Sequence, residues 1–456
     1  MFLWRPLQRV NDTLLLAREQ PFARGSIILT ITAGISYALG LLRDRMLAAT
    51  FGASDPLDAY QASFIVPDLL FNAFVAGGLT AAFIPVFTDL RTRHRNQEAT
   101  RLAGTLLTAG VAILIVVGLL IFLLARPLTT LVAPGFTTAK HDLLINLTRI
   151  MLLSPLLFFV SNLLGGMLVS AKHFLFYGIS PALYNLGIIA GILLFAPTLG
   201  IYSAALGTLL GALLHLLARL IDLRRADLHL IPSTSLSPAL RKVIVLMLPR
   251  VVGLTAVQMQ LWAFTAIAST RGEGAVTIVN LARNFQSFPV SLIGISFATS
   301  LFPLLAESAS RRARSQYLQQ LTKGMLTTLA VVVPATLAMY ILRRPIISVL
   351  IGTGQFDAAA IARTAAVLGI YTLSIPTESI NHLLSRAFYA LHNTLIPVTI
   401  SIVSIAASVG TAYLFAPTID VAGIPAAFAV GTTLQTLLLA ALLHPQIRHW
   451  FTRPAK

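Results

Sequence analysis

The sequence contains no cysteine and has few charged residues of either sign. Without cysteine the chain forms no disulfide bond and offers no thiol chemistry. Asp, Glu, Lys and Arg make up 11% of the 456 residues, whereas they make up about a quarter of a soluble globular domain. Acidic residues are scarcer than basic ones, with 16 Asp and Glu against 33 Lys and Arg. This scarcity of charge excludes an ordinary soluble domain.

Motifs of enzymatic catalysis are lacking as well. The chain has no cluster of paired carboxylates on a loop, no Ser–His–Asp order and no histidines at metal-binding spacing. The segment "GTGQFD" is rich in glycine, but it follows an apolar run and no strand-to-helix context surrounds it, which disfavours a nucleotide site. We therefore expect no enzyme, no cofactor and no metal.

Long apolar runs are what the sequence has in abundance. Hydrophobic residues make up 56% of the chain and the mean hydropathy is +0.83. A membrane-spanning helix needs about 20 apolar residues. We expect twelve such spans, at 26–50, 57–88, 99–125, 142–170, 178–196, 200–221, 243–269, 276–306, 321–342, 359–390, 395–416 and 421–444. The sequence thus predicts an all-α polytopic membrane protein.

The net charge of +17 is distributed unevenly among the loops. Most Lys and Arg residues fall in the loops on the side of the N-terminus, and the opposite loops hold only Arg126, Lys140, Arg271, Arg343, Arg344 and Arg363. This asymmetry follows the positive-inside rule and predicts that both termini are cytoplasmic. The basic excess is therefore a topology signal that also attracts anionic lipids, and we expect no nucleic-acid partner.

Short motifs recur at an offset near 218 residues. "AAFIPVFTDLRTR" parallels "TSLFPLLAESASRRAR", Arg126 parallels Arg344, and His173 parallels His392. Six spans per repeat give both halves the same orientation, so we expect two six-helix lobes related by a pseudo-two-fold axis along the membrane normal, with a central cavity. The expected segments are a cytoplasmic N-terminal segment (1–25), an N-lobe (26–221), a cytoplasmic linker (222–242), a C-lobe (243–445) and a cytoplasmic tail (446–456).

Charges within or beside the spans are the candidate site residues, because such charges normally face water or a partner. Arg43 and Asp44 end the first span, and Asp58 opens the second. Neighbouring positions on a helix point about 100° apart, so we expect that Arg43 and Asp44 form no simple pair on one face. We expect one of the two side chains to contact a neighbouring helix and the other to face the cavity.

The second lobe contributes arginines of its own. Arg250 follows Pro249 near the start of the seventh span, and Arg283 lies in a span that also carries Asn284. A guanidinium group offers a planar fork of donors that suits phosphate and never loses its charge. Arginines from both lobes would make a cationic cavity, which predicts an anionic substrate.

Carboxylate and amide groups in the second lobe are candidates for ion coupling. They are Gln258, Gln260, Glu378 and Asn381. A cation or a proton could bind there, and the membrane potential, Na⁺ or H⁺ would each fit as the energy source.

A series of motifs gives the chain a resemblance to a known family. "LLRDRMLAATFGASDPLDAYQASFIVPDLL", "VAPGF", "LPRVVGLTAVQMQ", "FPVSLIGISFATSLFPLL", "GTGQFD" and "SRAFYALHNTLIPV" follow one another as in the MurJ/MviN lipid II flippases of the multidrug/oligosaccharidyl-lipid/polysaccharide exporter superfamily. The resemblance implies two lobes, a cationic cavity and alternating access. It implies that lipid II, the polyprenyl-diphosphate precursor of peptidoglycan, moves from the inner to the outer leaflet of the bacterial inner membrane.

The resemblance also assigns residues. Arg43, Asp44 and Asp58 match charges of the family's first two spans. Other family charges are replaced: Tyr37 stands for an Arg of span one, Phe71, Asn72 and Ala76 for an Arg-Arg pair and a Glu of span two, and Arg283 and Asn284 for an Asp-Arg pair. The substrate-binding candidates are therefore Arg43, Asp44, Asp58, Asn72, Arg250, Arg283 and Asn284.

Three other functions remain as alternatives. The chain could export another polyprenyl-linked glycan or a drug, although a cationic drug would favour a carboxylate-lined cavity. It could be a non-transporting scaffold for other cell-wall synthesis proteins. It could also be a membrane-embedded transferase, which would need catalytic residues on an outer loop.

Overall fold

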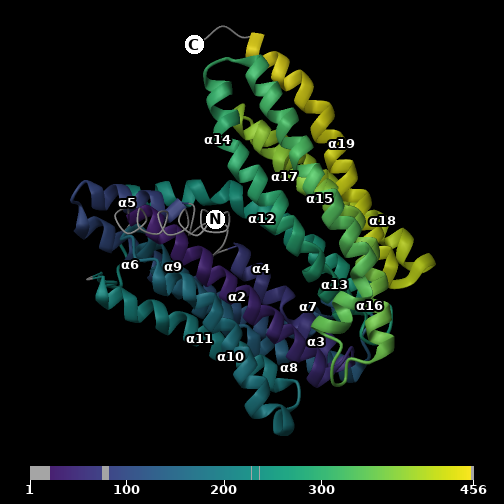
Figure 1. Ribbon diagram of the computed structural model, residues 1–456. Coiled ribbons are helices and arrows are strands. Elements are labelled where there is room, and N and C mark those ends of the chain that lie inside the picture. Colours follow the sequence, from purple (N-terminus) through teal and green to yellow (C-terminus); the bar gives the residue numbers. More distant parts are fainter. Residues whose placement is uncertain (1–20, 74–81, 227, 236, 453–456) are drawn as a thin grey trace, which may run out of the picture. The chain divides into compact units, whose positions relative to one another are not determined.

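The computed structural model describes residues 21–73, 82–226, 228–235 and 237–452 (Figure 1), with the backbone alone at 21–24, 248–250 and 252. The described chain is helical, which confirms the all-α prediction. Nine helical segments of the described residues are long and apolar enough to cross a membrane. One of them, Leu395–Thr452, contains two of the expected spans. The expected spans 57–88 and 243–269 are not among the nine: the first includes residues outside the description, and the second lies in α12 (Pro238–Ser269).

The chain forms two compact units. Of the described residues, unit 1 contains those up to Leu47 together with those of Ser63–Leu128 and Asp142–Thr255. Unit 2 contains Ala48–Ala62, Thr129–His141 and the chain from Ala256 onward. Short segments of the first half of the sequence therefore belong to the same unit as the second half.

Unit 1 is a bundle of long helices around a shared apolar core. Its helices are α2 (Pro21–Phe51), α4 (Ile65–Phe71), α5 (Ile84–Thr92), α6 (Asn96–Leu123), α9 (Leu153–Ser170), α10 (Leu175–Leu199) and α11 (Tyr202–Arg225). Five helices run from one unit into the other along the chain: α2, whose residues from Ala48 onward belong to unit 2, α3 (Asp55–Ser63), α7 (Ala125–Val132), α8 (Thr138–Met151) and α12. The core of unit 1 includes Phe83, Phe87, Leu163 and Leu164.

Unit 2 has a bundle of its own. Its helices are α13 (Ala275–Pro289), the π-helical η3 (Val290–Ile295), α14 (Ser296–Ser310), α15 (Arg314–Leu350), α16 (Ala358–Tyr371), η4 (Thr372–Ser374), α17 (Ile375–Ala390), α18 (Leu395–Ile419), η5 (Asp420–Ala422) and α19 (Gly423–Thr452). Tyr317 and Phe388 are fully buried in its core.

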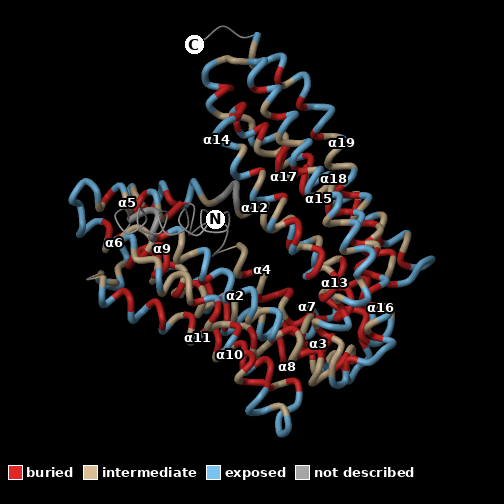
Figure 2. Tube along the Cα trace, viewed as in Figure 1, coloured by how far each residue is buried: buried red, intermediate tan, exposed pale blue. Residues whose placement is uncertain are grey.

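Large apolar side chains also cover much of the surface. Exposed residues follow one another along α6 and α15, among them Val116, Leu119, Leu337 and Ile341 (Figure 2). A soluble monomer rarely exposes a contiguous apolar surface of this extent. Together with the span lengths, this surface makes the chain a multi-pass membrane protein.

The tightest helix pair of unit 1 depends on glycine. A Cβ atom at Gly187 of α10 would lie 2.3 Å from the Cα atom of Gly211 in α11, and one at Gly191 would lie 2.4 Å from the Cα atom of Gly207. Small residues at four-residue spacing let helix backbones approach closely in membranes. The two glycine pairs therefore allow α10 and α11 to touch backbone to backbone.

The backbone repeats the offset seen in the sequence. Residues with positive φ pair up at separations of 218 to 220 residues: Gly52 with Gly272, His94 with Arg312, Lys172 with His392, and Gly200 with Asp420. The same four turns therefore end helices in both halves. At the last pair, Asp420 has φ 55° and ψ −144°, close to the 53° and −134° of Gly200. Such values are strained for a residue with a side chain.

This strain generates a prediction. Replacing Asp420 by Gly should stabilise the protein by about 1 kcal/mol, because relief of the backbone strain exceeds the entropy that glycine loses on folding. Thermal unfolding of the detergent-solubilised protein measures the effect. The reciprocal change, Gly200→Asp, should lower the unfolding temperature although nothing lies within 4 Å of its Cβ position. An unchanged or lower unfolding temperature for D420G would contradict the strain argument.

Candidate functional site

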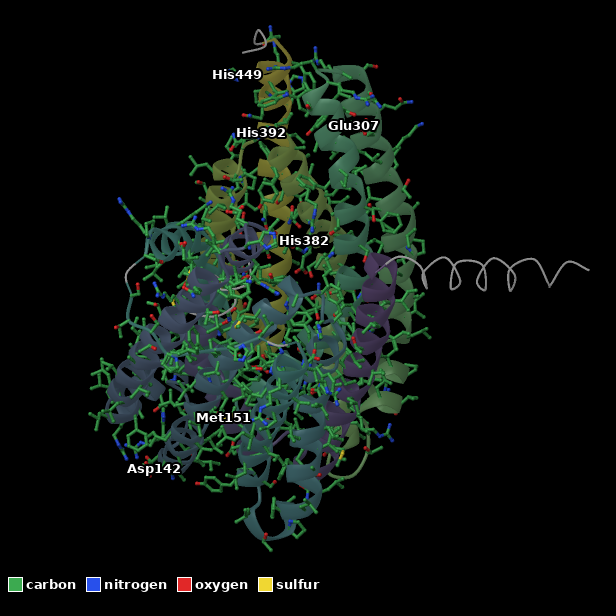
Figure 3. The ribbon with its side chains drawn as sticks, turned by 90° about the vertical axis from the view of Figure 1, so that its left-hand side faces the viewer. Asp142, Met151, Glu307, His382, His392 and His449 are labelled. Carbon is green, nitrogen blue, oxygen red and sulfur yellow. The ribbon has the colours of Figure 1, made fainter. Side chains whose placement is uncertain are left out.

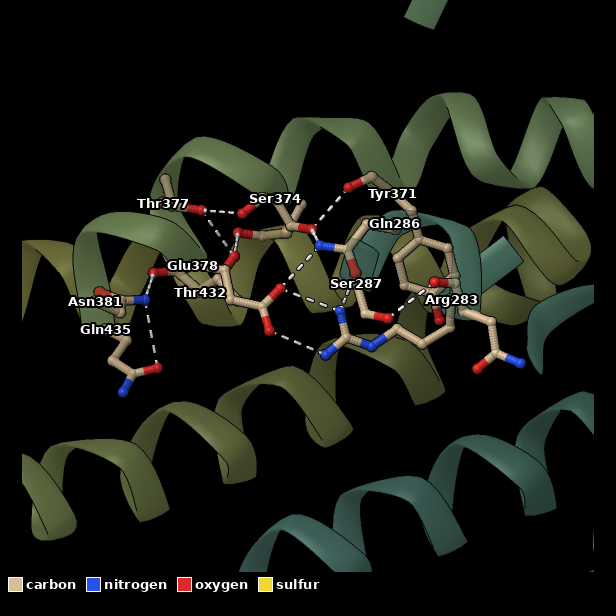
Figure 4. Close-up of polar contacts among 12 residues, drawn as sticks. Arg283, Gln286, Ser287, Tyr371, Ser374, Thr377, Glu378, Asn381, Thr432 and Gln435 are labelled. Atoms are coloured by element: carbon tan, nitrogen blue, oxygen red, sulfur yellow. Dashed lines mark hydrogen bonds and ion pairs between the residues drawn. The ribbon is translucent and has the colours of Figure 1, made fainter. Parts of the chain in front are cut away.

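The central polar contact of unit 2 joins Arg283 on α13 to Glu378 on α17 (Figure 4). The Arg283 Nη1 and Nη2 atoms donate to Glu378 Oε2 and Oε1, each at 3.1 Å. The guanidinium group also lies over the Phe428 ring, 4.0 Å from its centroid. A bidentate pair of this kind holds both side chains in a fixed geometry.

Neighbouring polar groups complete the pair. Gln286 accepts a hydrogen bond from Arg283 and donates from Nε2 to Glu378 Oε2 at 2.8 Å and to Ser374 Oγ at 3.0 Å. Gln286 lies one helical turn after Arg283, and Ser374 one turn before Glu378. Gln286 is therefore a neutral partner of both charged groups, and Ser374 holds the Gln286 amide in place.

Arg283 lies in the wall of two cavities of unit 2. The larger has a volume of about 190 Å³ and is lined by Gln260, Glu378, Asn381, His382 and Gln435, among others. The smaller, of about 40 Å³, is lined by Asn280 and Tyr371 with apolar neighbours. His382 lies midway along the helices of unit 2, whereas His392 and His449 lie toward one end (Figure 3). The larger cavity thus reaches the middle of this bundle.

The structure brings four of the predicted residues to this cavity: Gln260, Arg283, Glu378 and Asn381. Asn381 Nδ2 donates to the Thr432 carbonyl oxygen at 2.9 Å, and Thr436 Oγ1 donates to Asn381 Oδ1 at 2.8 Å, so this amide joins α17 to α19. Gln258 is buried on α12. His382, which lies one helical turn after Glu378, was not predicted from the sequence.

Arg43 and Asp44 correct a prediction. The Arg43 Nε and Nη2 atoms donate to Asp44 Oδ1 at 3.0 and 2.7 Å, so the neighbours do form a pair. The expectation considered only the directions in which the two side chains leave the helix, and the long arginine side chain curls back to the carboxylate. Arg43 Nη1 also donates to Asn185 Oδ1 on α10 at 2.9 Å, so Arg43 additionally answers a neighbouring helix.

Unit 1 has a cavity of about 470 Å³. Residues of α2, α4, α9, α10 and α11 line it: Leu29, Thr32, Ala33, Ser36, Tyr37, Phe71, Phe158, Asn162, Tyr177, Gly178, Pro181, His215 and Arg219. Tyr37 and Phe71, which replace arginines of the resembling family, thus lie in the same wall. Arg219, in the same wall, is not among the site residues predicted from the sequence.

Asp58 is the centre of a buried network within unit 2. Its Oδ1 atom accepts hydrogen bonds from Thr277 N and Oγ1 at 2.8 and 2.7 Å, and its Oδ2 atom accepts one from Lys140 Nζ at 2.8 Å. Lys140 also donates to Asp55 Oδ1 at 2.5 Å. The network ties α3, α8 and the start of α13 together. These contacts make Asp58 a structural anchor, and substrate binding by Asp58 stays a prediction.

The remaining substrate-binding candidates are Asn72, Asn284 and Arg250, and the described side chains among them line none of the cavities above. Asn72 Nδ2 donates to the Asp68 carbonyl oxygen at 2.9 Å within its own helical turn. Asn284 is exposed on α13. The Arg250 side chain lies outside the described residues, so its predicted role stays a prediction.

Comparison with known proteins decides the family. The family model described as "Lipid II flippase MurJ" matches residues 47–454. The chain belongs to the MurJ family. This confirms the resemblance seen in the sequence motifs.

Curated MurJ relatives cover most of the chain. The lipid II flippase MurJ of Burkholderia cenocepacia is 29% identical over 421 residues, which are 89% of this chain and 80% of the relative. The probable lipid II flippase MurJ of Bdellovibrio bacteriovorus is 29% identical over 423 residues, 91% of this chain and 80% of the relative.

Solved structures share the fold. A lipid II flippase MurJ in an inward closed conformation has a TM-score of 0.80 at 21% identity, covering 93% of this chain and 90% of the other. An inward-facing multidrug resistance MATE family transporter also has a TM-score of 0.80, at 14% identity, covering 94% of this chain and all of the other. The two-lobe fold class predicted from the sequence is thereby confirmed.

The buried network generates a prediction about stability. Lys140→Met leaves the fully buried Asp58 carboxylate without its cation, so we expect a loss of about 3–5 kcal/mol. Thermal unfolding measures it. The matched control is Arg126→Met, because Arg126 pairs with Asp142 at 2.8 Å but is 70% exposed, against 5% for Lys140. Removal of an exposed pair costs about 0–1 kcal/mol. Equal unfolding temperatures for the two variants would contradict the anchoring role.

Proposed function

We propose that the protein is a flippase that moves lipid II across the membrane by alternating access. The match to the MurJ family model over residues 47–454 is the observation that carries this proposal. The names of the curated relatives and the shared transporter fold support it. The substrate is the polyprenyl-diphosphate precursor of peptidoglycan, carried from the inner to the outer leaflet, and the protein acts as a transporter in cell-wall synthesis rather than as an enzyme.

The chemistry of the cavities supports an anionic substrate. Arg283 in unit 2 and Arg219 in unit 1 each line a cavity together with hydroxyl and amide groups. Guanidinium groups bind phosphate oxygens through two parallel hydrogen bonds. A diphosphate carries enough charge and enough acceptors to use such groups, while the sugar and peptide part can bond to the neutral polar side chains.

The Arg283–Glu378 pair suggests how transport is coupled to an ion. In the structure Glu378 neutralises Arg283. When a diphosphate binds Arg283, it competes with the carboxylate, and a displaced Glu378 needs a new partner because an isolated buried charge is costly. A proton or Na⁺ can supply that partner beside Asn381 and His382. Glu378 would then be the coupling residue, and the gradient of its cation the energy source.

Location and orientation follow from the proposal. The protein would lie in the bacterial inner membrane with both termini in the cytoplasm, as the positive-inside rule indicates. Lipid II would reach it from synthesis at the inner leaflet and leave it toward the outer leaflet, where other cell-wall synthesis proteins are its natural partners.

A second candidate is export of a different polyprenyl-linked glycan or of a drug. The fold match to a MATE multidrug transporter favours it, and so does the replacement of family arginines by Tyr37 and Phe71. Arg283 and Arg219 argue for an anion in either case.

The proposed function predicts a loss of transport when Arg283 is replaced. In cells whose own lipid II export is switched off, Arg283→Ala should reduce outer-leaflet lipid II at least tenfold compared with wild type, because the variant loses the guanidinium and leaves Glu378 unpaired. Labelling of surface-exposed lipid II measures it, with membrane protein quantified in parallel. Arg126→Ala, on an exposed pair, is the control and should export normally. Normal export by R283A would rule out the assigned role of Arg283, and no export by the wild type would rule out lipid II.

The proposed coupling role of Glu378 predicts a change in the ion dependence of transport. In proteoliposomes, transport by wild-type protein should depend on a proton or Na⁺ gradient, and Glu378→Gln should remove that dependence, because an amide cannot exchange a cation. The experiment compares transport with and without each gradient. Retained gradient dependence in E378Q would place the coupling elsewhere.

A further inference from the structure

Arg219 is a buried arginine that has no carboxylate partner among the described residues. It lies on α11 and is 3% exposed. Its Nη1 atom donates to the Ser161 carbonyl oxygen at 2.9 Å and to Asn162 Oδ1 at 3.2 Å, and its Nε atom is buried without a hydrogen-bond partner. The guanidinium group lies 4.8 Å from the centroid of the Tyr177 ring. All of these contacts are neutral.

Burial of a charge with only neutral partners is unusual. A buried guanidinium group normally has a carboxylate beside it, because an uncompensated charge loses its hydration without replacement. The buried Lys140 and the half-buried Arg283 each have such a partner. Arg219 therefore carries a positive charge and at least one donor that are not used within the described part of unit 1.

The surroundings of Arg219 are shaped to hold it in place. A Cβ atom at Gly165 of α9 would lie 2.6 Å from Arg219 Nη1, so the guanidinium group occupies the space that the glycine leaves open. His215, one turn earlier on α11, bonds through Nδ1 to Ser161 Oγ at 2.7 Å. The same residue, Ser161, thus fixes both side chains, which orients the α11 face toward the cavity.

The cavity that Arg219 lines is large, and its described lining carries neutral polar groups beside the one arginine. Its volume is about 470 Å³, within the range of about 300–1,000 Å³ typical of small-molecule sites. The lining includes the hydroxyl-bearing Thr32, Ser36 and Tyr37, the amide Asn162 and the His215 ring, and none of the described lining residues is Asp or Glu. A space with one cation, several neutral donors and no carboxylate is complementary to an anion.

We propose that this cavity of unit 1 binds a phosphate or diphosphate group through Arg219. The phosphate chemistry follows from the unused donor, the uncompensated charge and the surrounding hydroxyl and amide groups. Two sources could supply the group: the diphosphate of the polyprenyl substrate, in which case the inference rests on the proposed function, or the head group of a membrane phospholipid. In this chain Arg219 provides a cation in the same cavity as Tyr37 and Phe71, the positions where family arginines are replaced.

The first test measures inorganic pyrophosphate binding to the full-length protein in an uncharged detergent, by calorimetry. Arg219→Gln should weaken binding at least tenfold, whereas Arg126→Gln, which removes an exposed arginine of the same unit, should leave it unchanged. Binding by R219Q at the wild-type affinity would overturn the inference.

A second variant covers the case in which R219Q does not fold. Tyr37 is 61% exposed and lines the same cavity, so Tyr37→Arg adds a second cation without disturbing the core. We expect Y37R to tighten pyrophosphate binding about tenfold. Unchanged affinity in Y37R would show that the cavity does not receive the anion, and would overturn the inference.

Native mass spectrometry distinguishes the two sources of phosphate. Loss of co-purified polyprenyl-diphosphate lipid in R219Q identifies the substrate as the source, and loss of a phospholipid with polyprenyl lipid retained identifies the head group. Retention of both at wild-type levels contradicts the site. The binding experiments need no transport, so Arg219-dependent pyrophosphate binding without lipid II export would refute the proposed function alone, and export without such binding would refute the site alone.

Discussion

A charge inside an apolar bundle needs a partner, and this requirement organises the polar residues of the chain. Burial removes the hydration of an ion, and only an opposite charge or several hydrogen bonds replace it. Lys140 forms salt bridges with Asp58 and Asp55, and Arg283 forms one with Glu378. The surroundings of each pair indicate whether it has a structural or a binding role. Lys140 is 5% exposed and shares its carboxylate with the backbone of α13, which indicates an anchor. Arg283 lines cavities, which indicates a site.

The repeat gives the two halves a common framework and different polar contents. Turns with positive φ recur at a nearly constant offset, so the halves share their helix ends. The cavities do not repeat in the same way. Among the described residues, the cavity of unit 1 contains a cation without a carboxylate, whereas the larger cavity of unit 2 contains an ion pair beside amide groups. A duplicated scaffold can therefore carry two different anion sites, because turn geometry and cavity side chains are set by different residues.

The sequence was sufficient for the fold but only for part of the site. Apolar runs of span length and the offset between halves predicted an all-helical membrane protein, and the motifs predicted the family. Arg283 and Glu378 could be selected because they are charges far from span ends. The Arg43–Asp44 pair was missed because side-chain length, not helix periodicity, decides it. Lys140 and Arg219 were missed because each lies near a span end, where a basic residue is ordinarily a topology signal. Only the fold shows that Lys140 meets Asp58, 82 residues away, and that Arg219 turns inward.

The difference between Arg219 and Arg283 has a consequence for the order of events. An anion that reaches Arg283 must displace a carboxylate held at 3.1 Å on the neighbouring helix, and a tethered competitor acts at high effective concentration. An anion that reaches Arg219 displaces no carboxylate among the described residues, because the hydrogen-bond partners of this guanidinium group are neutral. The phosphate should therefore bind more readily at Arg219, and engagement of Arg283 should require a second favourable event. Capture of a cation by the released Glu378 is such an event. Under the two proposals, coupling would reside at the Arg283–Glu378 pair and initial recognition at Arg219.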